Sequence, residues 1–267
     1  MAVFDINFTS SSLRRLTRMT AIIPIEDIQL DPTKPLPDKS KPFRTLVLLH
    51  GFYGNEKDWL QGSRIEYLAT LHNIAVLCPC GENSFYMDDT SRDALYEQLI
   101  CKEVLEFGRK VFPLSTKRED TTIGGLSMGG FGAIRNGLKR NDVFGNIIAL
   151  SSALITDGVA KGVVQQNNPL ATACYFDHVF GKPDEVLGTD RDPKALAKSL
   201  LEAGESIPNI YMACGSEDFL IEENKDFSAF LNEVGIKHEF HISPGNHNWA
   251  FWDEYIEKAL DWLDEQD

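Results

Sequence analysis

The stretch TTIGGLSMGGFGAIRNGLKRN, residues 121–141, places a serine between glycines where a β-branched run gives way to a segment of helical character. Glycine is entropically costly inside strands and helices, so Gly125 and Gly129 on either side of Ser127 need a reason. The spacing G-x-S-x-G is that of a nucleophile elbow, a sharp turn in which larger flanking side chains would clash. Ordinary Gly-rich turns show the same spacing, so the interpretation depends on what the rest of the chain supplies.

Length and charge limit the classes of function. The chain has 267 residues, 43% of them hydrophobic, which is enough to bury a large core in one α/β domain. The formal net charge of −14 opposes binding to nucleic acid or to anionic membranes. The start has no signal-peptide pattern, and no stretch approaches the length of a membrane span. We expect one domain over residues 1–267, a cytoplasmic location, and neither nucleic-acid nor membrane partners. Assembly into a homo-oligomer stays open.

The cysteines indicate neither a disulfide framework nor a metal site. Their number is odd and they lie scattered in apolar surroundings, as is typical of free buried thiols. Pro79 separates Cys78 from Cys80, and no second Cys or His cluster has the spacing of metal ligands. We therefore expect no bound metal. The five cysteines are Cys78, Cys80, Cys101, Cys174 and Cys214.

Continuous apolar runs of strand length follow a Pro-rich segment at 31–42 that reads as a loop. Runs that are apolar on both faces are typical of strands covered by helices on both sides. Nearer the start, Phe4, Ile6 and Phe8 alternate with polar residues, and RLTRMTAIIP follows, which predicts antiparallel strands at an edge. The runs are TLVLLH (45–50), NIAVLC (73–78), TTIGGL (121–126), NIIALS (146–151) and NIYMAC (209–214).

Segments with helical periodicity separate most of these runs. They are SRDALYEQLICKEVLEFGRKVF (91–112), KDFSAFLNEVG (225–235) and EYIEKALDWLDE (254–265). The alternation predicts an α/β fold with a mostly parallel central sheet and helices on both faces. Residues 152–207 carry no strand signal, and we expect this insertion to form a cap or a wall of a pocket.

A serine nucleophile needs a base within hydrogen-bond reach, and that base needs an acid to orient it. The predicted strand at 209–214 runs into GSEDFL, which places Asp218 at the carboxyl end of a strand, where catalytic groups collect. Glu217 is the rival acid, and the order of strand, turn, Asp and helix favours Asp218. Of six histidines, His247 follows a further predicted strand, the alternating IKHEFHI (236–242), and precedes the C-terminal helix. Nucleophile, acid and base then follow one another in an order known for such triads.

An acyl-transfer site also needs donors for an oxyanion. We assign one to the backbone N–H of Met128, at a helix start where N–H groups and the helix dipole favour negative charge. The second should come from the loop HGFYGNEKDW after the strand at 45–50. We assign it to Phe52, with Tyr53 as the alternative, and expect His50 to support the loop.

Four segments together resemble the esterase D-like branch of the α/β-hydrolases, and most of all its tributyrin-type short-chain esterases. They are LLHGFYGNEKDWL, GLSMGGFGA, CGSEDFLIEEN and SPGNHNWAFWDEY, and the similarity extends through YFDHVFG and DPKALAKSL. The resemblance implies an α/β-hydrolase fold and a serine carboxylesterase without cofactor that acts on a small-molecule ester through an acyl-enzyme. It matches Ser127, Asp218 and His247 to the triad, and Phe52 and Met128 to the oxyanion loop and elbow.

Other functions remain as alternatives. S-formylglutathione hydrolases usually carry Cys in the oxyanion loop and His in SMGGHG, whereas this chain has GFYGN and Phe131. Feruloyl and acetylxylan esterases belong to the same branch, and an aromatic pocket would suit a phenolic acyl group. A catalytically inactive binding protein would have no reason to keep the ordered triad. The bulk of Phe52, Tyr53 and Trp249 predicts a short acyl pocket. The pocket candidates are Tyr53, Trp59, Phe85, Tyr86 and Trp249.

Overall fold

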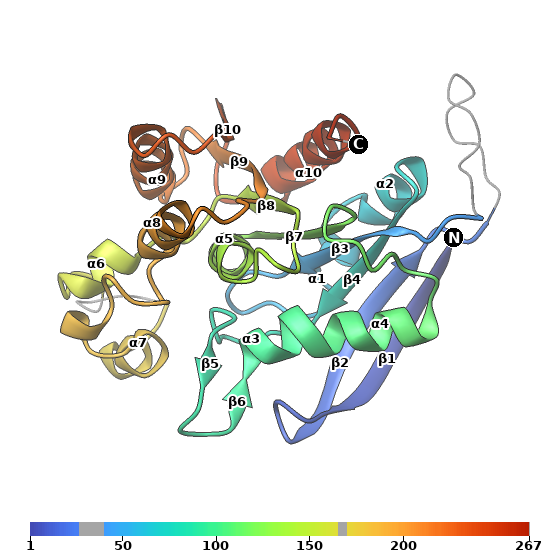
Figure 1. Ribbon diagram of the computed structural model, residues 1–267, viewed down its shortest axis with the longest axis horizontal. Helices are drawn as coiled ribbons and strands as arrows, with labels where there is room; N and C mark the ends of the chain where they lie inside the picture. Colours follow the sequence, from blue (N-terminus) through green and yellow to red (C-terminus); the bar gives the residue numbers. More distant parts are fainter. Residues whose placement is uncertain (27–39, 165–169, 267) are drawn as a thin grey trace.

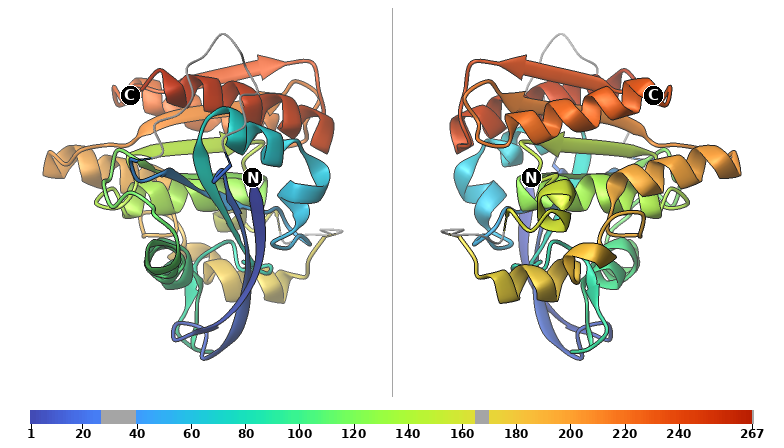
Figure 2. Two further views of the ribbon diagram at one scale, coloured as in Figure 1. Left: turned by 90° about the vertical axis from the view of Figure 1, so that its right-hand side faces the viewer. Right: turned by 90° about the vertical axis from the view of Figure 1, so that its left-hand side faces the viewer.

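The computed structural model describes residues 1–26, 40–164 and 170–266 of the chain. Within these ranges, eight strands form one sheet in the order β1-β2-β4-β3-β7-β8-β9-β10, with helices on both of its faces (Figure 1, Figure 2). The strands are β1 (Ala2–Ser10), β2 (Arg15–Ile23), β3 (Arg44–Leu49), β4 (Ile74–Pro79), β7 (Thr121–Leu126), β8 (Asn146–Leu150), β9 (Asn209–Gly215) and β10 (Glu239–Ser243).

Strand direction follows the sequence pattern. β2 pairs antiparallel with β1 and with β4, and every other neighbouring pair in the sheet is parallel. The apolar runs β4, β7 and β8 are buried along their whole length, whereas β1 alternates and lies at an edge. The predicted mostly parallel sheet with antiparallel N-terminal strands is therefore confirmed. The loop predicted at 31–42 lies outside the described residues as far as residue 39.

Two apolar layers cover the sheet. Ile65 and Leu68 of α2 pack with Ile256 and Leu260 of α10 on one face, while α4, α5, α8 and α9 contribute to the core on the other. Among the described residues, no helix has the length and apolar character that a membrane crossing requires. The helices are α1 (Asp58–Gly62), α2 (Ile65–Leu71), α3 (Tyr96–Gln98), α4 (Val104–Val111), α5 (Met128–Lys139), α6 (Thr156–Ala160), α7 (Ala173–Phe180), α8 (Pro193–Ala203), α9 (Ile221–Glu233) and α10 (Trp249–Asp264).

The helix predicted at 91–112 begins later than the sequence pattern indicates. Its first residues instead form a turn and the strand β6 (Ala94–Leu95), which pairs with β5 (Asp88–Asp89). Asp88 Oδ1 accepts the N–H groups of Glu97 at 2.8 Å and Gln98 at 3.2 Å, so this carboxylate caps the helix start. A π-helical turn, Leu99–Glu103, then joins α3 to α4.

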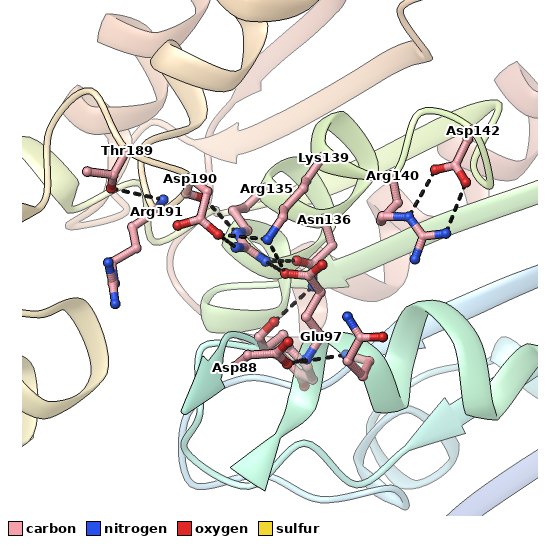
Figure 3. Close-up of polar contacts among 12 residues, drawn as sticks. Asp88, Glu97, Arg135, Asn136, Lys139, Arg140, Asp142, Thr189, Asp190 and Arg191 are labelled. Carbon is pink, nitrogen blue, oxygen red and sulfur yellow. Dashed lines mark hydrogen bonds and ion pairs between the residues drawn. The ribbon is translucent and has the colours of Figure 1, made fainter. Parts of the chain in front are cut away.

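The insertion between β8 and β9 carries α6, α7, the short 3₁₀ helix Pro183–Glu185 and α8, at the left of Figure 1. An ionic network centred on the buried pair Arg135 and Glu97 ties it to α5 and α3, as Figure 3 shows. Arg135 of α5 is 2% exposed; it pairs with Glu97, and its Nη2 lies 2.7 Å from Asp190 of the insertion. Lys139 Nζ reaches the same two carboxylates. Since α5 starts directly after Ser127, the network fixes the insertion relative to the elbow.

Candidate active site

Ser127 stands at a strained turn between β7 and α5. Its φ of 55° and ψ of −118° lie in a backbone region that residues other than glycine rarely adopt. A Cβ at Gly125 would lie 2.5 Å from the carbonyl oxygen of Gly129, and one at Gly129 would lie 2.5 Å from that of Leu49. Neither neighbour can therefore carry a side chain without moving the backbone, which is the steric requirement of a nucleophile elbow.

Three side chains from distant parts of the chain meet at the carboxyl edge of the sheet. His247 Nε2 lies 3.0 Å from Ser127 Oγ. On the other side of the ring, Nδ1 lies 2.9 Å from Asp218 Oδ2. Ser127 follows β7, Asp218 follows β9, and His247 lies between β10 and α10. Parallel strands bring these loops to one edge, and a serine, an imidazole and a carboxylate in this order can generate a nucleophile by proton transfer.

The environment of Asp218 keeps it ionised. Its side chain is fully buried, which by itself would raise its pKa. The hydrogen bonds from His247 and from the N–H of Leu220, at 2.9 Å, outweigh burial and hold the pKa of Asp218 below its ordinary value. The rival acid Glu217 is exposed and accepts hydrogen bonds from Ser216 and from the N–H of Gly245. Glu217 therefore shapes the turn before His247 and leaves the imidazole to Asp218.

The loop after β3 is held by His50. Its Nε2 accepts the N–H of Gly81 at 2.9 Å, and its Nδ1 donates to the carbonyl of Gly51 at 2.7 Å. Burial lowers the pKa of His50, in keeping with the neutral ring that these two bonds require. The N–H of Tyr53 in the same loop donates to Asn83 Oδ1 at 2.9 Å. In the described part of the chain the N–H of Phe52 has no such acceptor.

Two cavities meet at Ser127. The His247-side cavity, of about 630 Å³, is lined by His247, Tyr53, Asp58, Trp249 and Trp252 among others. The Met128-side cavity, of about 340 Å³, reaches under the insertion and is lined by Phe85, Met128, Ile155, Phe176, Leu220 and Glu223 among others. Phe52, Ser127, Leu170 and Phe219 border both. The arrangement leaves room on each side of Ser127 for one half of a substrate whose reacting bond lies at the serine.

Similarity to known proteins agrees with this geometry. The model of a family described as "Putative esterase" matches residues 32–263. The chain belongs to this esterase family. An acetyl esterase of Caldicellulosiruptor saccharolyticus is 44% identical to the esterase over 270 residues, covering 98% of each chain. The predicted α/β-hydrolase resemblance is confirmed, and the chain is an ester hydrolase.

Solved structures give the same fold. The S-formylglutathione hydrolase FrmB of Staphylococcus aureus matches the esterase with a TM-score of 0.83 at 28% identity, covering 98% of each chain. A structure named ferulic acid esterase matches with a TM-score of 0.74 at 22% identity, covering 100% of this chain and 99% of that one. Because the ferulic acid esterase is only 22% identical, its similarity is evidence for the fold alone.

Two predicted pocket residues of the esterase lie in the core instead. Trp59 is 1% exposed, and its Nε1 donates to the carbonyl of Leu49 at 2.9 Å. Tyr86 is fully buried, and its hydroxyl donates to the carbonyl of His50 at 2.8 Å. Both side chains support the loop after β3 from behind, because each has a polar group that a backbone carbonyl can satisfy inside the core. Phe85, Tyr53 and Trp249 do line the cavities.

The sequence analysis did not predict several of the residues that line the two cavities. Phe219 stands next to Asp218, and its ring centroid lies 4.6 Å from that of His247, so its position in the chain was a usable signal. Trp252 lies one helical turn after Trp249, and its ring meets His247 edge-on at 4.9 Å. Ile155, Phe176 and other insertion residues carried no such signal. Across the described ranges, no group of three or more His, Cys, Asp or Glu is placed to hold a metal ion.

Proposed function

We propose that the esterase hydrolyses short-chain carboxylic esters through an acyl-enzyme on Ser127, with His247 as general base and Asp218 as the residue that orients it. The observation that carries this proposal is the unbroken chain of hydrogen bonds from Asp218 through His247 to a serine held in an elbow. The 44% identical relative named acetyl esterase supports a small acyl group.

The geometry supports a two-step reaction. His247 Nε2 accepts the Ser127 hydroxyl proton as Oγ attacks the ester carbonyl, and Asp218 stabilises the imidazolium that forms. When the C–O bond breaks, His247 returns the proton to the departing alcohol, and the acyl group stays on Oγ. Water then attacks the acyl-enzyme, with His247 again accepting a proton, and the carboxylic acid leaves.

Backbone N–H groups of Phe52 and Met128 would stabilise the tetrahedral oxyanion. Met128 is the first residue of α5, so its N–H has no acceptor within the helix and lies at the positive end of the dipole. Of the two candidates in the loop after β3, Tyr53 already uses its N–H on Asn83. Phe52 is therefore the better donor, and we assign the second position to it.

The two cavities receive different parts of the ester. His247 must protonate the departing alcohol, so the alcohol belongs in the cavity that His247 lines. The acyl group then lies in the Met128-side cavity. Tyr53 and Trp249, which the sequence analysis expected to shorten the acyl pocket, border the alcohol side, and of those three bulky residues Phe52 alone borders both cavities. A volume of about 340 Å³ allows acyl groups longer than acetyl.

One observation keeps a phenolic ester as a second candidate. Phe52, Phe85 and Phe176 line the acyl side, and aromatic walls suit an aromatic acyl group. A glutathione thioester is a weaker candidate. The described residues that line the alcohol side include Asp58 but neither Lys nor Arg, so the carboxylates of glutathione would find no cation there.

We also propose a reducing, cytoplasmic setting for the esterase. All five cysteines are free, and Cys174 is exposed. An exposed free thiol persists where the compartment keeps thiols reduced.

The test replaces the nucleophile. Ser127→Ala should lower kcat on p-nitrophenyl acetate and butyrate by about 10⁴ to 10⁶, since only the oxyanion donors and binding would remain. Ser216→Ala is the matched control, because Ser216 is exposed beside the site but outside the hydrogen-bond chain. Mass spectrometry after fluorophosphonate treatment should find the label on Ser127. Normal turnover by Ser127→Ala would exclude the proposal.

A further inference from the structure

Glu223 is an acidic side chain in an otherwise apolar cavity. It lies in the first turn of α9 and lines the Met128-side cavity together with Ser127. Apart from these two, every described residue of the lining is Phe, Met, Ala, Ile, Val or Leu. Glu223 is partly exposed, but its Oε2 atom is buried among these side chains, and burying a carboxylate oxygen is costly unless a partner compensates for the lost water.

No such partner is found within the described structure. Glu223 Oε2 is buried and without a hydrogen bond, and no ion pair reaches the carboxylate from the described residues. The neighbouring Glu222 differs, because it is exposed and pairs with Lys225 at 2.8 Å. Buried polar atoms in proteins are nearly always hydrogen-bonded, so an unpartnered acceptor in a substrate cavity indicates a donor that comes from outside the chain.

The negative charge of Glu223 also acts on the buried thiol of Cys214. The pKa of the Cys214 thiol is raised to about 12, first by burial and then by the negative charges of Asp218 and Glu223. The Cys214 thiol nevertheless makes no hydrogen bond to Glu223 Oε2, which has no partner among the described residues. The unsatisfied acceptor therefore belongs to the cavity wall.

We propose that Glu223 accepts a hydrogen bond from a hydroxyl group on the acyl chain, so that the esterase prefers hydroxyacyl esters to unsubstituted acyl esters of the same length. The inference rests on the proposed function, because it takes the Met128 side as the acyl side. A hydroxyl would satisfy Oε2, whereas a methyl terminus would leave it unpaired. Sites built to bond a substrate hydroxyl discriminate strongly against analogues that lack it.

The experiment compares matched ester pairs. All substrates are p-nitrophenyl esters. The 3-hydroxybutyrate ester is paired with the butyrate ester, the 6-hydroxyhexanoate ester with the hexanoate ester, and the 4-hydroxycinnamate ester with the cinnamate ester. The readout is the ratio of kcat/KM within each pair, which cancels changes common to both esters. Between wild type and Glu223→Leu, this ratio should fall by about tenfold or more for at least one pair, the effect of losing a hydrogen bond to a charged acceptor.

Two further variants keep the test decisive. Glu223→Gln keeps an acceptor oxygen without the charge, is nearly isosteric, and should give an intermediate ratio even if the leucine variant folds poorly. Glu222→Leu is the matched control and should keep the wild-type ratio. Unchanged ratios for all three pairs in both Glu223 variants would overturn the inference, as would an equal fall in Glu222→Leu. Butyrate hydrolysis that survives in the Glu223 variants but not in Ser127→Ala would leave the proposed function standing.

Discussion

Replacing Asp218 with Asn should lower kcat by about 10⁴ while the protein stays folded. Asp218 Oδ1 accepts the Leu220 N–H at 2.9 Å, while His247 Nδ1 lies nearer to Oδ2, at 2.9 Å, than to Oδ1, at 3.1 Å. Asn has one acceptor oxygen, and keeping it on Leu220 turns the amide NH₂ toward the imidazole. Nδ1 must then accept, so the ring proton moves to Nε2. An Nε2–H facing Ser127 cannot act as a base.

The magnitude follows from the tautomer. A triad with its imidazole held in the wrong tautomer loses about 10⁴ in kcat, or about 5.4 kcal/mol at 1.36 kcal/mol per factor of ten. Steady-state kinetics with p-nitrophenyl butyrate should show this loss with little change in KM, because the substrate contacts persist. Glu217→Gln is the control, since Gln retains the acceptor for the Gly245 N–H. A loss in Asp218→Asn smaller than tenfold, or an equal loss in the control, would refute the reasoning.

Further consequences can be measured on stability and reactivity. Because the folded-state pKa of Asp218 is lowered, the stability that wild type gains over Asp218→Asn should be full above about pH 4, the ordinary pKa of the carboxyl. It should shrink as the pH falls through the folded-state pKa. Thermal unfolding of both proteins between pH 7 and 3 measures this, and a Tm difference that widened on acidification would contradict it. Gly129→Ala should abolish activity and destabilise the fold by about 1–3 kcal/mol, because the new Cβ meets a carbonyl oxygen at 2.5 Å, whereas Gly188→Ala, with open space around it but a φ of 75°, should cost only backbone strain. Ellman's reagent at pH 8 should titrate one thiol, Cys174, in the native protein and five in denaturant, because Cys174 alone is exposed and burial raises the pKa of others such as Cys214 to about 12; two fast thiols in the native state would be the contrary result.

The sequence predicted the framework well where local pattern and burial agree. Strands that are apolar on both faces must be covered on both sides, so β4, β7 and β8 could be placed almost to the residue. The helix predicted at 91–112 was too long, because its periodicity could not reveal that Asp88 caps a later start. That cap comes from a neighbouring hairpin, and no helical pattern contains it.

The elbow and its partners could be read from chain order, since each belongs to a short motif at the end of a strand. The steric reason for Gly125 is local, since its Cβ would meet the backbone of Gly129, whereas the Cβ of Gly129 would meet Leu49 in the distant strand β3. The glycine pattern itself is nevertheless visible in a short stretch of sequence. The sequence did not show which aromatic side chains face the cavities. Trp59 and Tyr86 lie in the core, while Phe219 and Trp252 line a cavity, although Trp59, Phe219 and Trp252 all belong to the quoted motifs.

By itself, then, the sequence determined the parallel sheet, the elbow at Ser127 and the order in which Asp218 and His247 join it, because backbone sterics and apolar periodicity act over a few residues. Only the tertiary structure decided that two cavities meet at the serine and that Glu223 enters one of them without a partner. Those features arise where α9, the insertion and the loop after β3 pack together. Contacts among segments so far apart in the chain leave no periodic trace in any one of them.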